Sequence, residues 1–182
     1  MSLSGKKGIK ILSFFIALSM AFSCFFILPI CSRAESELTP ETTPVSDQIY
    51  TIATAEQLLR LSEFSQTNTC SNMTFRLIAD IDLNPGCIFR SDGSYDGTPT
   101  TFKPIGKNGC PFKGNFDGGV YTIRGLYIND SSESMVGLFG YTSGADISNV
   151  TLQNSYVSGN GTVGGICGEA NNTTITNCST AA

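Results

Sequence analysis

The sequence predicts an all-β domain, built as a short parallel β-helix (β-solenoid) with a small capping helix at its N-terminal end. Three observations predict this fold: an internal repeat of 28 residues, short runs of β-branched and aromatic residues, and frequent turn residues, among them 19 glycines. Only 14% of the residues are charged, and no copy of the repeat holds a ten-residue window with helical periodicity. A solenoid of helices is therefore not predicted.

The repeat is defined by an apolar pair flanked by glycines. Gly137-Leu138-Phe139-Gly140 is followed by Ile147, and Gly165-Ile166-Cys167-Gly168 is followed by Ile175, with every position offset by 28 residues. A looser copy, about 24 residues upstream, runs from Gly114 to Asp117 and continues to Ile123. A single coil of this kind cannot bury its apolar face alone, whereas stacked coils enclose an apolar interior.

Corresponding positions of the copies predict the inside of the solenoid. Ile123, Ile147 and Ile175 are expected to form one inward-facing ladder, in which each buried aliphatic side chain contributes about 1.5–3 kcal/mol. Asn149 and Asn177 match in the same way and predict a ladder of stacked amides at a turn. The alternative is that these two asparagines are unrelated surface turn residues.

A short helix and a strand are expected ahead of the repeats. Thr54-Ala55-Glu56-Gln57 has the pattern of a capping box, and Leu58, Leu61 and Phe64 lie on one face of a helix that ends near Phe64. This helix can cover the first coil and protect its open edge. The segment Phe75–Leu83, with alternation from Ala79 onward, predicts a half-buried strand.

The N-terminal residues predict export. Residues 1–34 hold four of the eleven basic residues and no acid, so the remainder, with seven basic and fifteen acidic residues, carries a net charge of -8. Basic residues up to Lys10, an uncharged stretch from Ile11 to Ile30 and small residues around Arg33 predict a signal peptide cleaved after Ala34. An uncleaved anchor, or a lipoprotein modified at Cys31, are the alternatives.

The expected domain organisation follows from these segments. Residues 1–34 are the signal peptide or anchor, residues 35–48 a disordered linker with two prolines, and residues 49–182 the β-helix domain. Whether that domain is truncated at its C-terminus is left open.

The sequence resembles the GLUG-motif repeat family. The glycine-flanked pairs and the Ile-x-Asn segments after them carry the resemblance. Three upstream segments fit it as well: Ala79-Asp80-Ile81-Asp82-Leu83, Pro104-Ile105-Gly106 and Phe112 to Gly118. The resemblance covers roughly residues 49–180. It implies a short right-handed parallel β-helix on a bacterial envelope, in some members alongside a metallopeptidase that cleaves immunoglobulin A. The chain has no histidine and therefore no HExxH motif, so the peptidase activity is not carried over.

Composition and spacing limit the chemistry. The absence of histidine excludes Ser-His-Asp and Cys-His catalytic units and imidazole metal ligands. A pI near 4.7 argues against nucleic acid as a partner. Asp80-x-Asp82-x-Asn84 resembles the start of a calcium loop, but its glycine is displaced and it lacks the final glutamate, so no metal site is predicted. No cofactor and no catalytic residue is predicted either. The loop with Asp92-Gly93 and Asp96-Gly97 is expected to be an irregular insertion between coils, and the alternative is a loop that binds an ion or a glycan.

The cysteines leave one question open. Seven are present, and five of them fall in the predicted domain, at Cys70, Cys87, Cys110, Cys167 and Cys178. Export permits disulfides, whereas the alternative is that several are small buried apolar residues. Their spacing does not favour a zinc site.

The function predicted from these observations is an exported bacterial cell-surface module, with an adhesion or structural display role and without catalysis. One alternative is a carbohydrate-active β-helix enzyme of the polysaccharide lyase or glycosidase kind, which would draw on Asp80, Asp82, Asp117, Lys103, Lys107, Lys113 and Arg124. The other is the N-terminal fragment of a larger surface adhesin. The expected partners are a protein or glycan of a host or an envelope, the membrane only through the N-terminal segment, and other copies of the chain through an open C-terminal edge.

Overall fold

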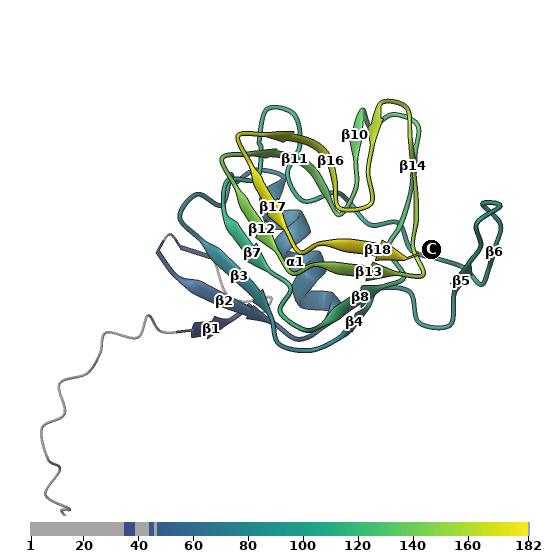
Figure 1. The fold of residues 1–182 in the computed structure, drawn as a ribbon, viewed down its shortest axis with the longest axis horizontal. Coiled ribbons are helices and arrows are strands. Elements are labelled where there is room, and N and C mark those ends of the chain that lie inside the picture. Colours follow the sequence, from purple (N-terminus) through teal and green to yellow (C-terminus); the bar gives the residue numbers. More distant parts are fainter. Residues whose placement is uncertain (1–34, 39–43, 46, 182) are drawn as a thin grey trace, which may run out of the picture. The chain divides into compact units, whose positions relative to one another are not determined.

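The computed structural model describes residues 35–38, 44, 45 and 47–181. This part of the chain is a parallel β-solenoid of about 5 turns with one short helix, which confirms the predicted fold class (Figure 1). The predicted signal peptide with its cleavage site at Ala34 lies outside the described residues. Among the helices that are described, none is long and apolar enough to cross a bilayer.

The first side of the solenoid is a parallel sheet of six strands (Figure 1). In spatial order its strands are β1 (Glu35–Glu37), β2 (Ile49–Ile52), β3 (Thr74–Leu77), β7 (Asn115–Asp117), β12 (Asp146–Ser148) and β17 (Thr174–Thr176). The second side has four parallel strands, β4 (Ile81–Asp82), β8 (Thr122–Arg124), β13 (Thr151–Gln153) and β18 (Ser179–Ala181). From β3 onward, each coil adds one short strand to each of these two sheets, because turn residues end every run of β-formers after a few positions.

The third side consists of three separate two-stranded parallel ladders. These pair β9 (Tyr127–Asp130) with β14 (Tyr156–Gly159), β10 (Met135–Val136) with β15 (Thr162–Val163), and β11 (Phe139–Ser143) with β16 (Cys167–Asn171). Single bridges from Ile105 to Phe139 and from Phe112 to Thr142 continue this side into the preceding coil.

The predicted 28-residue offset is confirmed by the strand register. Phe139 pairs with Cys167, Ile147 with Ile175 and Thr151 with Ser179. The asparagine ladder is confirmed as well: Asn177 Nδ2 donates to Asn149 Oδ1 at 3.3 Å. Both asparagines have positive φ, and Asn149 Nδ2 donates in turn to Asp117 Oδ1 at 2.9 Å, so the ladder extends one coil further than predicted.

The single isoleucine ladder needs a correction. Ile147 and Ile175 are neighbours in the first sheet, but the residue that precedes them there is Phe116, not Ile123. Ile123 lies in the second sheet, between Ile81 and Leu152. The looser repeat copy is out of register with the other two. Its segment from Gly114 pairs with the strand around Ile147, and it does not correspond to the glycine-flanked pair.

The glycines of the repeat motif lie where neighbouring coils approach closely. A Cβ atom on Gly140 would stand 2.6 Å from the carbonyl oxygen of Gly106, and one on Gly168 would stand 2.7 Å from the backbone nitrogen of Val136. Between the glycines, Leu138 and Phe139 are fully buried. The motif therefore combines a backbone contact between coils with an apolar pair directed into the core.

The helix α1 (Ala55–Ser65) follows β2 and begins with the predicted capping box. The Thr54 side chain accepts a hydrogen bond from the Gln57 backbone N–H at 3.2 Å, and Gln57 Oε1 accepts one from the Thr54 N–H at 3.1 Å. Leu58 and Leu61 are fully buried in the core, as predicted from their spacing.

Two further expectations are wrong in part. Residues 35–48 were expected to be disordered, but β1 pairs with β2 and Leu38 is fully buried, because this leucine packs into the same core as Tyr50 and Ile52. The segment Phe75–Leu83 is not one strand: β3 ends at Leu77 and β4 begins at Ile81 in the other sheet. The chain turns a corner between these two strands. The alternation of apolar and polar residues runs on into β4 and gives no sign of that corner.

Candidate functional site: a charged cleft on the third side

A cleft of about 410 Å³ opens where the segment 101–107 faces the segment 128–135. Its volume lies within the range of sites that bind small ligands. Its lining combines a few apolar side chains with polar and charged ones from two coils and from the end of α1: Gln66, Thr101, Phe102, Lys103, Pro104, Gly106, Lys107, Ile128, Asp130, Glu133 and Met135.

The helix α1 fixes the first wall of the cleft, which consists of residues 101–107. Ser62 Oγ donates to the Lys103 carbonyl at 2.5 Å, and Gln66 Nε2 donates to the Pro104 carbonyl at 2.9 Å. Ser65 Oγ accepts from the Gly106 N–H at 3.0 Å, inside the core. These bonds explain why two serines of the helix are buried, and they hold the backbone that carries the cleft lysines.

The neighbouring coil fixes the second wall, residues 128–135. Asp130 Oδ1 accepts from the backbone N–H and the hydroxyl of Ser132, at 2.8 and 2.6 Å, which closes a tight turn. The Thr162 N–H donates to the Ser134 carbonyl at 2.7 Å and joins this wall to the next coil. A backbone bond also ties the first wall to the residue just before the second, because the Phe102 N–H donates to the Tyr127 carbonyl at 2.8 Å.

The two walls carry charges of opposite sign. Lys103 and Lys107 stand on the first wall, and Asp130 and Glu133 stand on the second. Among the described residues, the ion pairs within 4.0 Å have only Arg76 and Arg90 as their cations, so neither lysine is in direct contact with Asp130 or Glu133. The hydrogen bonds from Ser132 lower the pKa of Asp130, which keeps its carboxylate ionised.

The base of the cleft is apolar. Phe102 and Ile128 are buried beneath it, and Met135 and Pro104 contribute to its sides. The cleft is therefore a slot with an apolar base, a positive wall and a negative wall.

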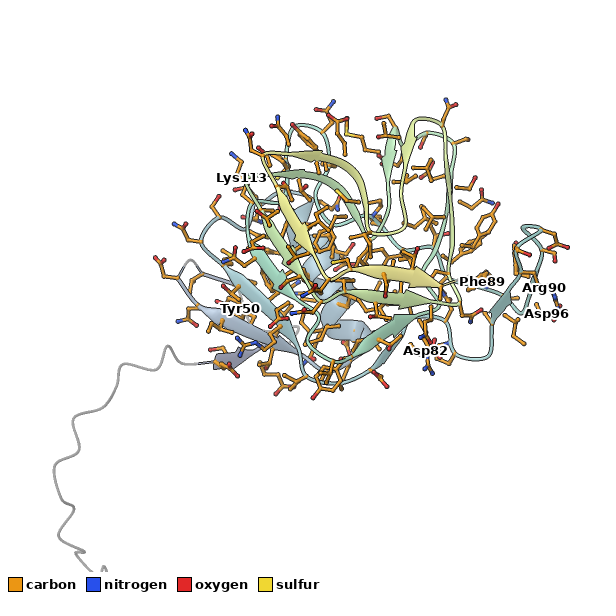
Figure 2. All side chains as sticks on the ribbon, viewed as in Figure 1. Tyr50, Asp82, Phe89, Arg90, Asp96 and Lys113 are labelled. Atoms are coloured by element: carbon orange, nitrogen blue, oxygen red, sulfur yellow. The ribbon has the colours of Figure 1, made fainter. Side chains whose placement is uncertain are left out.

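The structure brings together only some of the candidate residues named from sequence. Lys103 and Lys107 share the cleft, whereas Asp80, Asp117 and Arg124 hold coils together: Asp80 Oδ1 accepts from the Thr122 N–H at 2.8 Å, Asp117 is 3.5 Å from Arg76, and Arg124 Nε donates to Gln153. Lys113, which is labelled in Figure 2, does not line the cleft. Asp130 and Glu133 were missed as site residues, because only the stacking of coils places their turn opposite the lysines.

The calcium-like segment serves the fold. The Asn84 side chain is buried, with Nδ2 donating to the carbonyls of Gly125 at 2.7 Å and Thr100 at 3.1 Å, and its Oδ1 accepts from the Thr100 N–H. Asp82 Oδ1 accepts from the Asn84 N–H at 3.1 Å. In the described part of the chain, no three His, Cys, Asp or Glu side chains gather as metal ligands would.

The insertion between coils is an antiparallel hairpin of β5 (Ile88–Phe89) and β6 (Tyr95–Asp96), with an ion pair between Arg90 and Asp96 (Figure 2). It explains why 41 residues separate β3 from β7 where Asn115 meets Thr74. An aromatic cluster attaches the hairpin to the solenoid: Phe89 stacks on Tyr127 at 5.6 Å, and Tyr127 stacks on Tyr156 at 5.7 Å.

The five cysteines in the described residues are free thiols. Cys70 is buried, and burial followed by the charge of Cys110 raises the pKa of its thiol to about 12. A thiol held in this way is protonated at neutral pH and reacts slowly.

The fold and the cleft define this part of the chain as a β-solenoid domain with a charged lateral slot, and comparison with known proteins adds two relatives. The chain is 36% identical to halomucin of Haloquadratum walsbyi over 123 residues, which are 65% of this chain and 1% of that protein. It is 26% identical over 154 residues to a protein of Evansella cellulosilytica described provisionally as a Gly-rich membrane protein, covering 84% of this chain and 16% of that protein. The chain thus spans a small fraction of the length of these relatives.

No family model and no solved structure matches the chain. Membership of the GLUG-motif repeat family therefore stays a prediction.

Proposed function

We propose that the chain is an exported cell-surface module whose β-solenoid serves adhesion or structural display, without catalysis. The observation that carries the proposal is the similarity to halomucin and to a Gly-rich membrane protein, names that belong to surface-type proteins. The small share of each relative that is matched suits a module used within longer proteins.

The architecture suits such a role. Stacked coils fix the backbone on every side through strand pairing, so a feature on a lateral face keeps its geometry without support from a ligand. The charged cleft is such a feature, because the helix and the next coil fix both of its walls. We therefore propose that the module binds a ligand in the cleft.

The test of location uses intact cells of the organism that encodes the chain. An antibody raised against residues 47–181 should label intact cells, and added protease should remove the label while a cytoplasmic marker protein stays uncut. Labelling that appears only after lysis would contradict the proposal.

A carbohydrate-active enzyme is the second candidate, favoured by the two carboxylates, Asp130 and Glu133, on one wall of the cleft. Glycoside hydrolysis needs two carboxyl groups about 5–9 Å apart. Release of reducing ends from envelope polysaccharides, abolished by Glu133→Gln, would favour the enzyme. Unchanged polysaccharide would favour the non-catalytic module.

A further inference from the structure

We propose that the cleft binds a small zwitterion, a free amino acid or a short peptide with both termini free. The carboxylate would lie against Lys103 and Lys107, and the ammonium group against Asp130 and Glu133. The inference names the ligand class of the cleft and in that sense rests on the proposed function, but its test needs no statement about where the protein resides.

The separation of charge across the cleft leads to this ligand class. The positive side chains come from the wall fastened to α1, and the negative ones come from the wall of the next coil. Neither lysine forms an ion pair or a side-chain hydrogen bond with any described residue, and the Glu133 carboxylate forms none either. A ligand with charges at both ends would satisfy both walls at once.

Single-charge ligands fit this slot less well. The two lysines would attract an anion, but the two carboxylates across the cleft would repel it. The carboxylates would attract a cation, but the lysines would repel it. Like charges at close range oppose binding, whereas opposite charges on both sides strengthen it and fix the orientation of the ligand. The apolar base, which Phe102 and Ile128 form, accommodates the carbon chain between the charged ends.

The cleft is also shaped before any ligand arrives. The Ser62, Ser65 and Gln66 side chains hold one wall, and the Asp130 turn with Ser132 shapes the other. A ligand therefore orders only the ends of Lys103, Lys107 and Glu133, because Ser132 already holds the Asp130 carboxylate, and this keeps the entropic cost of binding low.

The probe is the dipeptide Gly-Leu, compared with its N-acetyl form, its C-terminal amide and the form capped at both ends. Residues 35–182, uniformly labelled with ¹⁵N, retain every residue of the buried core cluster and are titrated with each peptide by NMR. Gly-Leu should shift backbone amides of residues 101–107 and 128–135. Each single cap should weaken binding at least tenfold, since each removes one of the two charges.

Variants test which wall reads which end. Lys103→Met with Lys107→Met should abolish the preference for a free carboxylate while keeping the preference for a free ammonium. Asp130→Asn with Glu133→Gln should do the reverse, and the asparagine keeps an oxygen for the Ser132 turn. Lys113→Met with Asp146→Asn, the matched control away from the cleft, should change neither preference.

The outcomes separate clearly. Equal affinity for the four peptides, shifts that fall outside the two walls, or no shift with any of them would overturn the zwitterion assignment. The assignment would also be overturned if a neutral sugar shifted the cleft amides and none of the peptides did. These results would leave surface labelling of intact cells unchanged, so failure of the ligand class and failure of the proposed function are distinguishable.

Discussion

The substitution Ile147→Asp tests the core of the solenoid most directly. Ile147 is fully buried between Phe116 and Ile175 in the first sheet. Losing the isoleucine costs about 1.5–3 kcal/mol of burial, and placing a carboxyl group there adds an effective desolvation penalty of several kcal/mol. A total of about 5 kcal/mol or more is comparable with the whole stability of many domains, so the variant should be unfolded at 25 °C.

A matched control occupies the same ladder. Ile175 is the next residue in register, but it is 39% exposed because no coil covers it in the described structure. Ile175→Asp keeps much of its charge in water and should cost about 1–2 kcal/mol. Urea unfolding followed by circular dichroism measures both variants. Equal losses for Ile147→Asp and Ile175→Asp would refute the assignment of Ile147 to a closed core.

Three further predictions follow from the fold. Circular dichroism of residues 35–182 should be dominated by β-structure with a small helical part, and a helix-dominated spectrum would contradict the solenoid. The same polypeptide should self-associate at tens of micromolar in sedimentation velocity, because β17 and β18 each pair with a neighbouring strand on one side only. Ile175→Lys places a charge at that open end and should shift the polypeptide toward the monomer. A polypeptide without this substitution that is monomeric would refute the prediction. Cys70 should react slowly with iodoacetamide at pH 8, since a pKa raised to about 12 leaves its thiol protonated, and should react at the rate of an ordinary thiol in urea; rapid alkylation of the native protein would show that Cys70 is exposed.

Local sequence determined the repeating parts of the protein. The 28-residue offset, the asparagine ladder and the capping box at Thr54 all depend on residues that recur in identical positions or lie within one turn of helix, so spacing alone predicted them. The same holds for the glycine-flanked pairs, because a backbone approach that excludes a Cβ atom leaves glycine as the residue that fits.

Tertiary structure decided what depends on how unequal coils stack. The segment that begins at Gly114 resembles the glycine-flanked pair, although its strand pairs with the one around Ile147. Spacing therefore misaligned Ile123, and only strand pairing places it beside Ile81 and Leu152. Leu38 joined the core although its neighbours in sequence show no pattern. The cleft arises in the same way: its lysines and carboxylates lie in different coils, and pairing between coils, which acts across large separations in sequence, brings opposite charges to the two walls of one slot.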